Sequence, residues 1–135
     1  MDYYLLSEEP LKAADFNKKN GLYRMSVHMA TLAIDLMLKS VLYRLEPDNI
    51  LLVGHDHIGI LRVLEKEYPK EELKPIVKMS RKYFNDSRYS RTSNLVAFTE
   101  QLAAEFLGYA RQVKDYVDTD CQATIDDLQK KFGNK

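Results

Sequence analysis

The sequence has no tryptophan, a single cysteine, five glycines and four prolines. One cysteine cannot form an intrachain disulfide or, without several other ligands, a structural zinc site. Cys121 is therefore expected to be an ordinary thiol rather than a nucleophile. Glycine and proline are the residues that most often interrupt regular structure, so their scarcity favours long, uninterrupted elements.

Neither sign of charge is in excess, since 20 Lys and Arg residues face 20 Asp and Glu residues. This balance argues against a protein whose whole surface attracts nucleic acid, but it is compatible with a local basic patch. The first residues, 1–4, lack the basic and apolar regions of a secretion signal, and no unbroken apolar run approaches the length of a membrane span. We expect a cytoplasmic protein without a membrane partner.

Helical periodicity is what the sequence does contain, and no segment alternates like a strand. The spacing of apolar residues predicts one domain over 1–135, an all-α, antiparallel, up-and-down bundle of about five helices. The tail 119–135 is expected either to fray or to add a short C-terminal helix. The first expected helix starts at Ser7, its cap, and fades near 17–21. The others cover about 22–45, 57–68 and 71–84, and a last one starts between 93 and 99 and ends near 117.

The expected helix 22–45 is apolar around most of its surface, but it carries one polar row. Its members follow one another at intervals of three or four residues and so share a face: Arg24, His28, Thr31, Asp35 and Lys39. The row is either the solvated side of the helix or one wall of a cleft. The cleft gains support because an otherwise apolar central helix has little reason to keep a polar face.

The segment Gly54-His55-Asp56-His57 places titratable side chains at a helix boundary. Two histidines and an acid are suited to bind a metal or a phosphate, and neutral histidine also acts as a general base near neutral pH. The simpler interpretation is a turn in which Asp56 caps the following helix and His55 makes a local hydrogen bond.

A second polar segment, 85–94, is the longest without periodicity. Arg88 and Arg91 flank Tyr89 there. The planar guanidinium group matches phosphate, and a tyrosine ring can stack on a base, so anion binding is one interpretation. A solvated loop that Tyr89 anchors to the bundle is the other.

Known catalytic patterns fit poorly. The chain has no glycine-rich phosphate loop, metalloprotease helix or nucleophile elbow, so we expect no catalytic residue, bound metal or cofactor. One alternative is a metal-dependent phosphohydrolase of the HD type. Its metal ligands would be His28, the His55–Asp56 pair, and Asp115 or Asp118.

The order of these features resembles the HEPN superfamily of small helical domains. The matching pieces are Ala14-Asp15, then the segment 33–42 with Asp35 and Lys39 as the acid-x-x-x-Lys pair, then Gly54-His55-Asp56-His57-Ile58 as the Gly-His-Asp turn, then Ser87-Arg88-Tyr89, and finally Ala110 and Val113. Ser90 stands where the family usually has proline. The resemblance covers about residues 11–117.

The resemblance implies two roles. Many members are ribonucleases that use Arg followed by four to six residues and then His, whereas others bind a nucleotide or substrate beside a small nucleotidyltransferase. Both kinds usually dimerise. No histidine follows His57 here, so the ribonuclease dyad is absent.

We therefore expect a non-catalytic module of a toxin–antitoxin type of system that binds a nucleotide or RNA and forms a homodimer. The expected ligand-binding residues are Arg88, Arg91, Lys39, His55, Asp56, Asp35 and Tyr89. The alternative without a small ligand is a purely structural dimerisation domain, with an interface on the helices 71–84 and 93–117.

Overall fold

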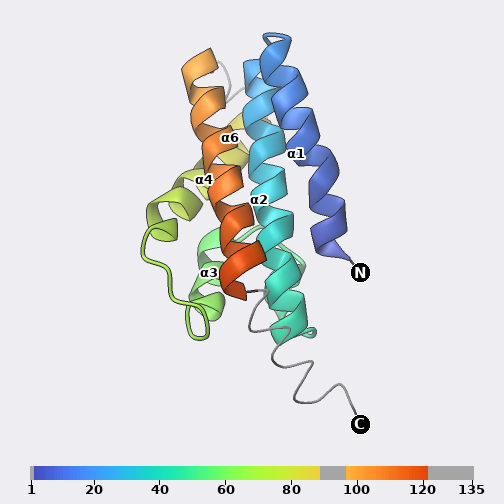
Figure 1. The fold of residues 1–135 in the computed structure, drawn as a ribbon, viewed down its shortest axis with the longest axis vertical. Coiled ribbons are helices and arrows are strands. Elements are labelled where there is room, and N and C mark those ends of the chain that lie inside the picture. Colours follow the sequence, from blue (N-terminus) through green and yellow to red (C-terminus); the bar gives the residue numbers. More distant parts are fainter. Residues whose placement is uncertain (1, 89–96, 122–135) are drawn as a thin grey trace.

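The computed structural model describes residues 2–88 and 97–121, with Arg88 described by its backbone alone. Within these ranges the chain forms five α-helices and no strand, which confirms the all-α bundle (Figure 1). The elements are α1 (Tyr3–Lys19), α2 (Tyr23–Leu45), the short η1 (Ile50–Leu52), α3 (His57–Leu64), α4 (Leu73–Arg88), α6 (Glu100–Asp115) and the π-helical turn η2 (Tyr116–Cys121).

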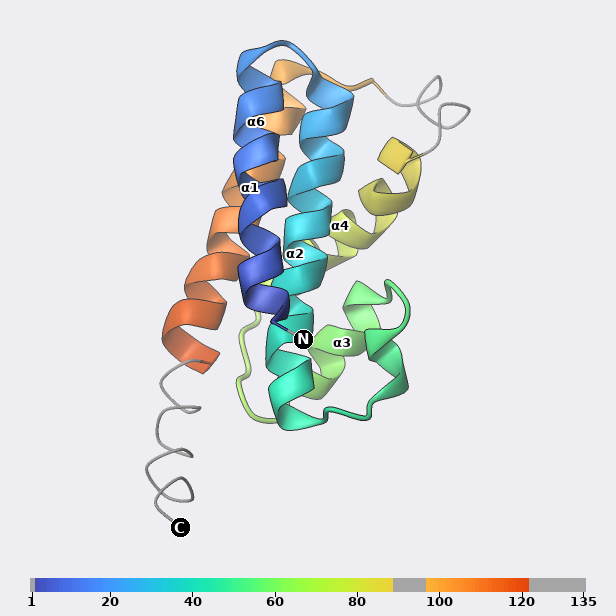
Figure 2. The same cartoon turned by 90° about the vertical axis from the view of Figure 1, so that its right-hand side faces the viewer.

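Helix α2 is the centre of the bundle and contacts every other element (Figure 2). It runs antiparallel to α1 and beside α6, while α4 crosses it obliquely and α3 covers its C-terminal half. Its apolar side chains are almost all excluded from solvent, among them Val27, Ile34, Leu38 and Leu42. Each buried side chain of this kind stabilises the fold by about 1.5–3 kcal/mol.

By length and composition alone, α2 is also apolar enough to cross a membrane. However, 72% of the apolar 18-residue stretch of α2 that could span a membrane is buried inside the protein. A core helix of a folded domain passes the same test, and burial against four other helices accounts for the apolar composition of α2.

Helix α1 begins earlier than the sequence predicts. The predicted cap at Ser7 is wrong, because Asp2 accepts a hydrogen bond from the backbone N–H of Leu5 and starts the helix at Tyr3. Ser7 lies inside α1, where its hydroxyl donates to the carbonyl of Tyr4, and Pro10 lies inside the helix rather than in its first turn.

Two other predicted boundaries also differ. Helix α3 ends at Leu64 and not near Tyr68, and α4 continues through Arg88 instead of ending at Phe84. The last turn of α4 is held by side chains from α2, described below, and local periodicity alone does not show such contacts.

The C-terminal part of the described chain is fastened at two places. The Tyr116 hydroxyl donates to the carbonyl of Tyr68 at 2.8 Å, in the core. At the surface, Lys114 donates to Asp118 and to the hydroxyl of Tyr4, and this hydroxyl donates to Asp118, which ties α1 to the end of α6. Burial raises the pKa of Cys121 to about 12, so the thiol stays protonated at neutral pH.

The predicted dimer surface on the fourth and last helices does not match the exposed apolar residues. In the described ranges the large apolar side chains with the greatest exposure lie on α1, in the α1–α2 connection, near the end of α2 and around η1: Leu5, Leu6, Phe16, Leu22, Tyr43, Ile50 and Val53. None belongs to α4 or α6, whose apolar faces pack into the core.

Candidate functional site

A buried carboxylate, Asp35 of α2, connects three elements. Its Oδ2 lies 2.9 Å from Lys39 Nζ and 3.3 Å from His55 Nδ1, and its Oδ1 lies 3.0 Å from His57 Nε2. The other ring nitrogen of His57, Nδ1, lies 3.1 Å from the Ser80 hydroxyl of α4. One acid therefore links α2 to the turn before α3, to α3 itself and, through His57, to α4.

The charge of Asp35 is stabilised by its neighbours. Burial opposes ionisation, but the adjacent His57 ring and Lys39 ammonium outweigh it and hold the pKa of Asp35 below its ordinary value. Solvent reaches 1% of the Asp35 side chain and 6% of the Lys39 side chain. These two residues thus form a buried ion pair and are not part of a solvated helix face.

The Asp35–His57–Ser80 arrangement has the order of a proton relay but no access for a substrate. His57 and Ser80 have no exposed surface. A nucleophile must reach the atom it attacks, so this set acts as a polar link between helices and not as a catalytic triad.

Phe84 of α4 forms the wall against which the three histidines lie. Its ring centroid is 4.6 Å from that of His55, and 5.5 Å from those of both His28 and His57. His55 is the one among them with substantial access to solvent, since 41% of its side chain is exposed. The cluster therefore reaches the surface at His55.

The polar row of α2 also fixes the end of α4. Arg24 donates from Nη1 to the carbonyl of Ser87 at 2.7 Å, and His28 Nδ1 lies 3.1 Å from the Ser87 hydroxyl. This hydroxyl donates to the carbonyl of Tyr83. A cation near the last carbonyls of a helix favours its C-terminal turn, which explains why α4 extends to Arg88.

The row thus meets both polar segments of the sequence, at Ser87 and at His55, but the Phe84 side chain packs between these two places. Its remaining member, Thr31, is buried and donates to the carbonyl of His28. It faces no ligand-accessible surface.

Asp56 has the local role that the simpler interpretation gave it. Its side chain accepts from the backbone N–H of Gly59 and caps α3, and Arg81 Nε lies 3.6 Å from the same carboxylate at the surface. The metal-site alternative loses support here, because His28 and Asp118 are engaged elsewhere, with Ser87 and Lys114 respectively. No group of three His, Cys, Asp or Glu suited to a metal occurs in the part of the chain that the structure describes.

The structure brings Asp35, Lys39 and His55 into contact, with Asp56 adjacent in the chain. Tyr89 and Arg91 lie outside the described residues, as does the side chain of Arg88. The backbone of Arg88 directly follows Ser87, whose hydroxyl lies 3.1 Å from His28 Nδ1, so the described part of α4 ends beside the histidine cluster.

The expected ligand-binding residues left out two members of the cluster, His57 and Phe84. His57 was considered together with His55 as a possible metal or phosphate ligand, but only His55 was kept as an expected site residue. Its position directly after the cap Asp56 was a signal that could have been used. His57 lies in the first turn of α3, and because this short helix packs on α2, side chains of its first turn can point toward α2. Phe84 gave no such signal, because an aromatic residue on an amphipathic helix ordinarily belongs to the core.

The geometry defines a small helical domain with a buried acid–lysine pair on its central helix and a Gly-His-Asp turn packed on that pair. The model of the HEPN domain matches residues 2–120, and the chain belongs to this family. No curated protein and no solved structure matches the chain.

Proposed function

We propose that this chain is a non-catalytic HEPN module that binds the phosphate groups of a nucleotide or RNA at the end of α4. In this proposal the chain forms a homodimer. It also acts as the partner of a minimal nucleotidyltransferase in a toxin–antitoxin type of system. HEPN domains are often paired with nucleotidyltransferases in such systems. The site comprises the exposed face of His55 together with Arg88, Tyr89 and Arg91.

The observation that carries the proposal is the convergence of α2 and the Gly-His-Asp turn on the last turn of α4. Asp35 orients His55 toward the surface, and Arg24 and His28 hold Ser87, the residue before Arg88. The chain therefore enters its arginine-containing segment from a fixed point beside a half-exposed histidine. A half-exposed histidine beside the start of a segment that carries two arginines in its sequence favours an anionic ligand.

The proposed roles follow from side-chain chemistry and, for the described residues, also from burial. Arg88 and Arg91 would contact phosphate, Tyr89 would stack on a base, and His55 would donate to the ligand. Direct phosphate contact by Lys39 is not supported by its geometry, because its ammonium is paired with Asp35 in the interior. We assign Asp35 and Lys39 to positioning His55, and Asp56 to shaping the turn through its cap.

The absence of the family's ribonuclease dyad supports a binding role. In the full sequence, the fifth to seventh positions after Arg88 are Ser93, Asn94 and Leu95, and those after Arg91 are Val96, Ala97 and Phe98. None is histidine. Arg24 and His28 are one residue too close, and both are occupied with Ser87.

A thermal-shift titration with AMP, ATP and a short single-stranded RNA tests the binding role. Binding raises the melting temperature, and the shift should decrease with salt because phosphate contacts release counterions. For RNA, loss of one phosphate contact in Arg88→Ala or Arg91→Ala should lower the salt slope of log K by about 0.7. Arg111→Ala, an exposed arginine on α6, is the matched control.

Two outcomes would refute this function. One is hydrolysis of RNA by the pure protein that disappears in Arg88→Ala, which would make the chain a nuclease. The other is no melting shift with any of the three ligands. Co-purification with a minimal nucleotidyltransferase and light scattering of the pure protein test the proposed partner and the homodimer separately.

A further inference from the structure

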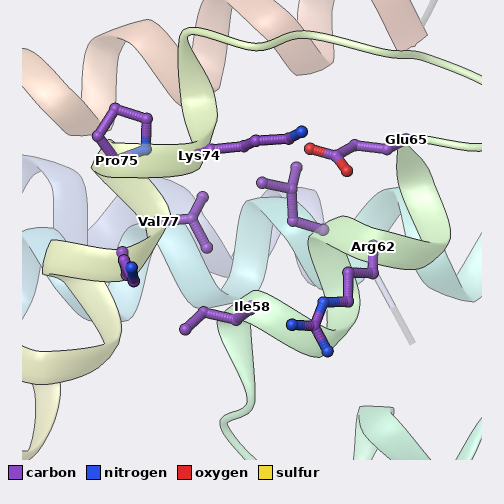
Figure 3. A pocket seen from close by; sticks show the side chains of 8 residues that line it. Ile58, Arg62, Glu65, Lys74, Pro75 and Val77 are labelled. Carbon is purple, nitrogen blue, oxygen red and sulfur yellow. The ribbon is translucent and has the colours of Figure 1, made fainter.

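A hollow lies apart from the histidine cluster, between α3 and the N-terminal half of α4. Its volume is about 460 Å³, within the range of about 300–1,000 Å³ typical of small-molecule sites (Figure 3). It is lined by Ile58, Leu61, Arg62, Glu65, Lys74, Pro75, Val77 and Lys78.

Helical spacing explains why these residues share the hollow. On α3 and the residue after it, positions 58, 61, 62 and 65 lie on one face, and on α4 positions 74, 77 and 78 do so. Leu61 and Val77 are buried and Ile58 is partly buried, so together they form an apolar floor. The charged side chains stand around this floor, as Figure 3 shows for Arg62, Lys74 and Glu65.

Two of the cations in this rim have no carboxylate partner among the residues that the structure describes. Arg62 and Lys78 are exposed, and no ion pair within the described part of the chain includes either. Lys74 differs, since it donates to Glu71 at 3.0 Å while its ammonium points toward Glu65. The hollow therefore offers two positive charges to an anion.

Glu65 adds a negative charge that needs a hydrogen-bond donor. Its Oε1 is excluded from solvent and accepts no hydrogen bond from any described residue. A buried carboxylate oxygen without a donor is costly, and such groups in native structures usually mark a missing partner. An N–H or ammonium group of a ligand would supply the donor.

From this juxtaposition we infer that the hollow binds a small molecule that carries an aromatic ring, an amino group and an anionic group. The ring would lie on Ile58, Leu61 and Val77, the amino group would donate to Glu65 Oε1, and the anion would face Arg62 and Lys78. Aromatic amino acids and adenine mononucleotides both have this chemistry. The inference does not depend on the proposed function, because it shares no residue with the His55 site.

Isothermal titration calorimetry with L-phenylalanine and with AMP tests the inference and distinguishes the two candidate ligand classes. At least one probe should bind the wild-type protein at millimolar concentration or below. Arg62→Ala and Lys78→Ala should each weaken that binding about tenfold, because each removes a charge-assisted contact. Both side chains are exposed, so these variants should fold normally.

The Glu65→Gln variant distinguishes an amino acid ligand from a nucleotide ligand. It keeps an acceptor but removes the negative charge, so it should weaken binding of the phenylalanine ammonium about tenfold and binding of the neutral adenine amine much less. Lys82→Ala is the matched control, since Lys82 is an exposed lysine of the same helix outside the hollow.

The inference fails if neither probe binds, or if binding is unchanged in both Arg62→Ala and Lys78→Ala. It also fails if Lys82→Ala weakens binding as much as they do, since that would indicate general attraction to a basic helix. If AMP is the one probe that binds, and its binding depends on His55 and not on Arg62, the result supports the other site and overturns this one.

Discussion

His57 Nε2 and Asp35 Oδ1 lie 3.0 Å apart, and both side chains are excluded from solvent. The contact joins the first residue of a short helix to the middle of the central one. Because Asp35 also pairs with Lys39 and His55, its loss would leave a buried ammonium and two imidazole rings without the carboxylate that they contact. The network thus connects α2 with α3 and with the turn before α3, and the orientation of His55 depends on it.

Replacing Asp35 by alanine should be severely destabilising. Removing one partner of a buried ion pair leaves the other charge uncompensated, at a cost of about 3–5 kcal/mol. Urea denaturation at neutral pH measures this loss. The matched control is Asp15→Ala, because Asp15 and Lys19 form the same i,i+4 pair at the surface of α1.

We expect the Asp15→Ala midpoint to stay close to the wild-type value, since exposed pairs of this spacing add little to stability. Equal losses in the two variants would show that the burial of Asp35 has no special importance.

The stabilisation by Asp35 should disappear in acid. Its folded-state pKa is below the ordinary value of 3.8, so the ionised form is favoured by folding. Its contribution is fully present above that ordinary value and is lost as the pH falls through the lower, folded-state pKa. Protonation removes the charge that faces Lys39, His55 and His57.

The measurement compares the free energies of unfolding of the wild type and Asp35→Asn over a pH series. The gap between them should be largest near neutral pH and should narrow below about pH 4. Other carboxylates titrate in both proteins and cancel in the difference. A gap that stays constant down to about pH 2 would contradict the assignment of the low pKa to Asp35.

The helices themselves were predictable from the sequence because their signals are local. Apolar spacing of three and four residues, together with scarce glycine and proline, gave the five-helix bundle and the polar row of α2. The row's members were grouped correctly because they lie on one helix, where spacing alone determines the shared face.

Contacts between helices were not predictable in the same way. Whether Lys39 reaches solvent or pairs with Asp35 depends on what covers α2, and α3 and its preceding turn cover it. The end of α4 was misplaced for the same reason, since Arg24 and His28 hold Ser87 from a helix about 60 residues earlier in the chain. A single sequence contains no record of such pairings.

Asp56 and Gly59 should show strong coupling. A Cβ atom at position 59 would lie 2.5 Å from Asp56 Oδ2, so Gly59→Ala forces the capping carboxylate away from its N–H donor. Asp56→Ala alone should cost about 1 kcal/mol through loss of the cap, and Gly59→Ala alone should also destabilise the protein.

In the Asp56→Ala background the same Gly59→Ala change should stabilise the protein by up to about 1 kcal/mol, because alanine favours a helix more than glycine does. A double-mutant cycle from thermal denaturation measures the coupling. Additive effects of the two changes would show that the carboxylate does not occupy the capping position.

Arg24 should control the order of the last turn of α4. Its Nη1 donates to the Ser87 carbonyl at 2.7 Å, and among the described residues no other cationic side chain donates to that carbonyl. Arg24→Ala should therefore speed amide hydrogen exchange in residues 84–88 about tenfold, which corresponds to the loss of one charge-assisted hydrogen bond. Exchange in α1 should change little. Arg111→Ala, the loss of an exposed arginine on α6, controls for charge.

The same variant connects the fold to the proposed site. If Arg24 fixes the point from which Arg88 leaves the helix, Arg24→Ala should reduce the melting shift produced by nucleotide or RNA, although Arg24 need not touch the ligand. Faster exchange with an unchanged ligand shift would show that the α4 end is dispensable for binding. Unchanged exchange would show that the hydrogen bond to Ser87 does not hold the turn, and the convergence on which the site depends would lose its structural basis.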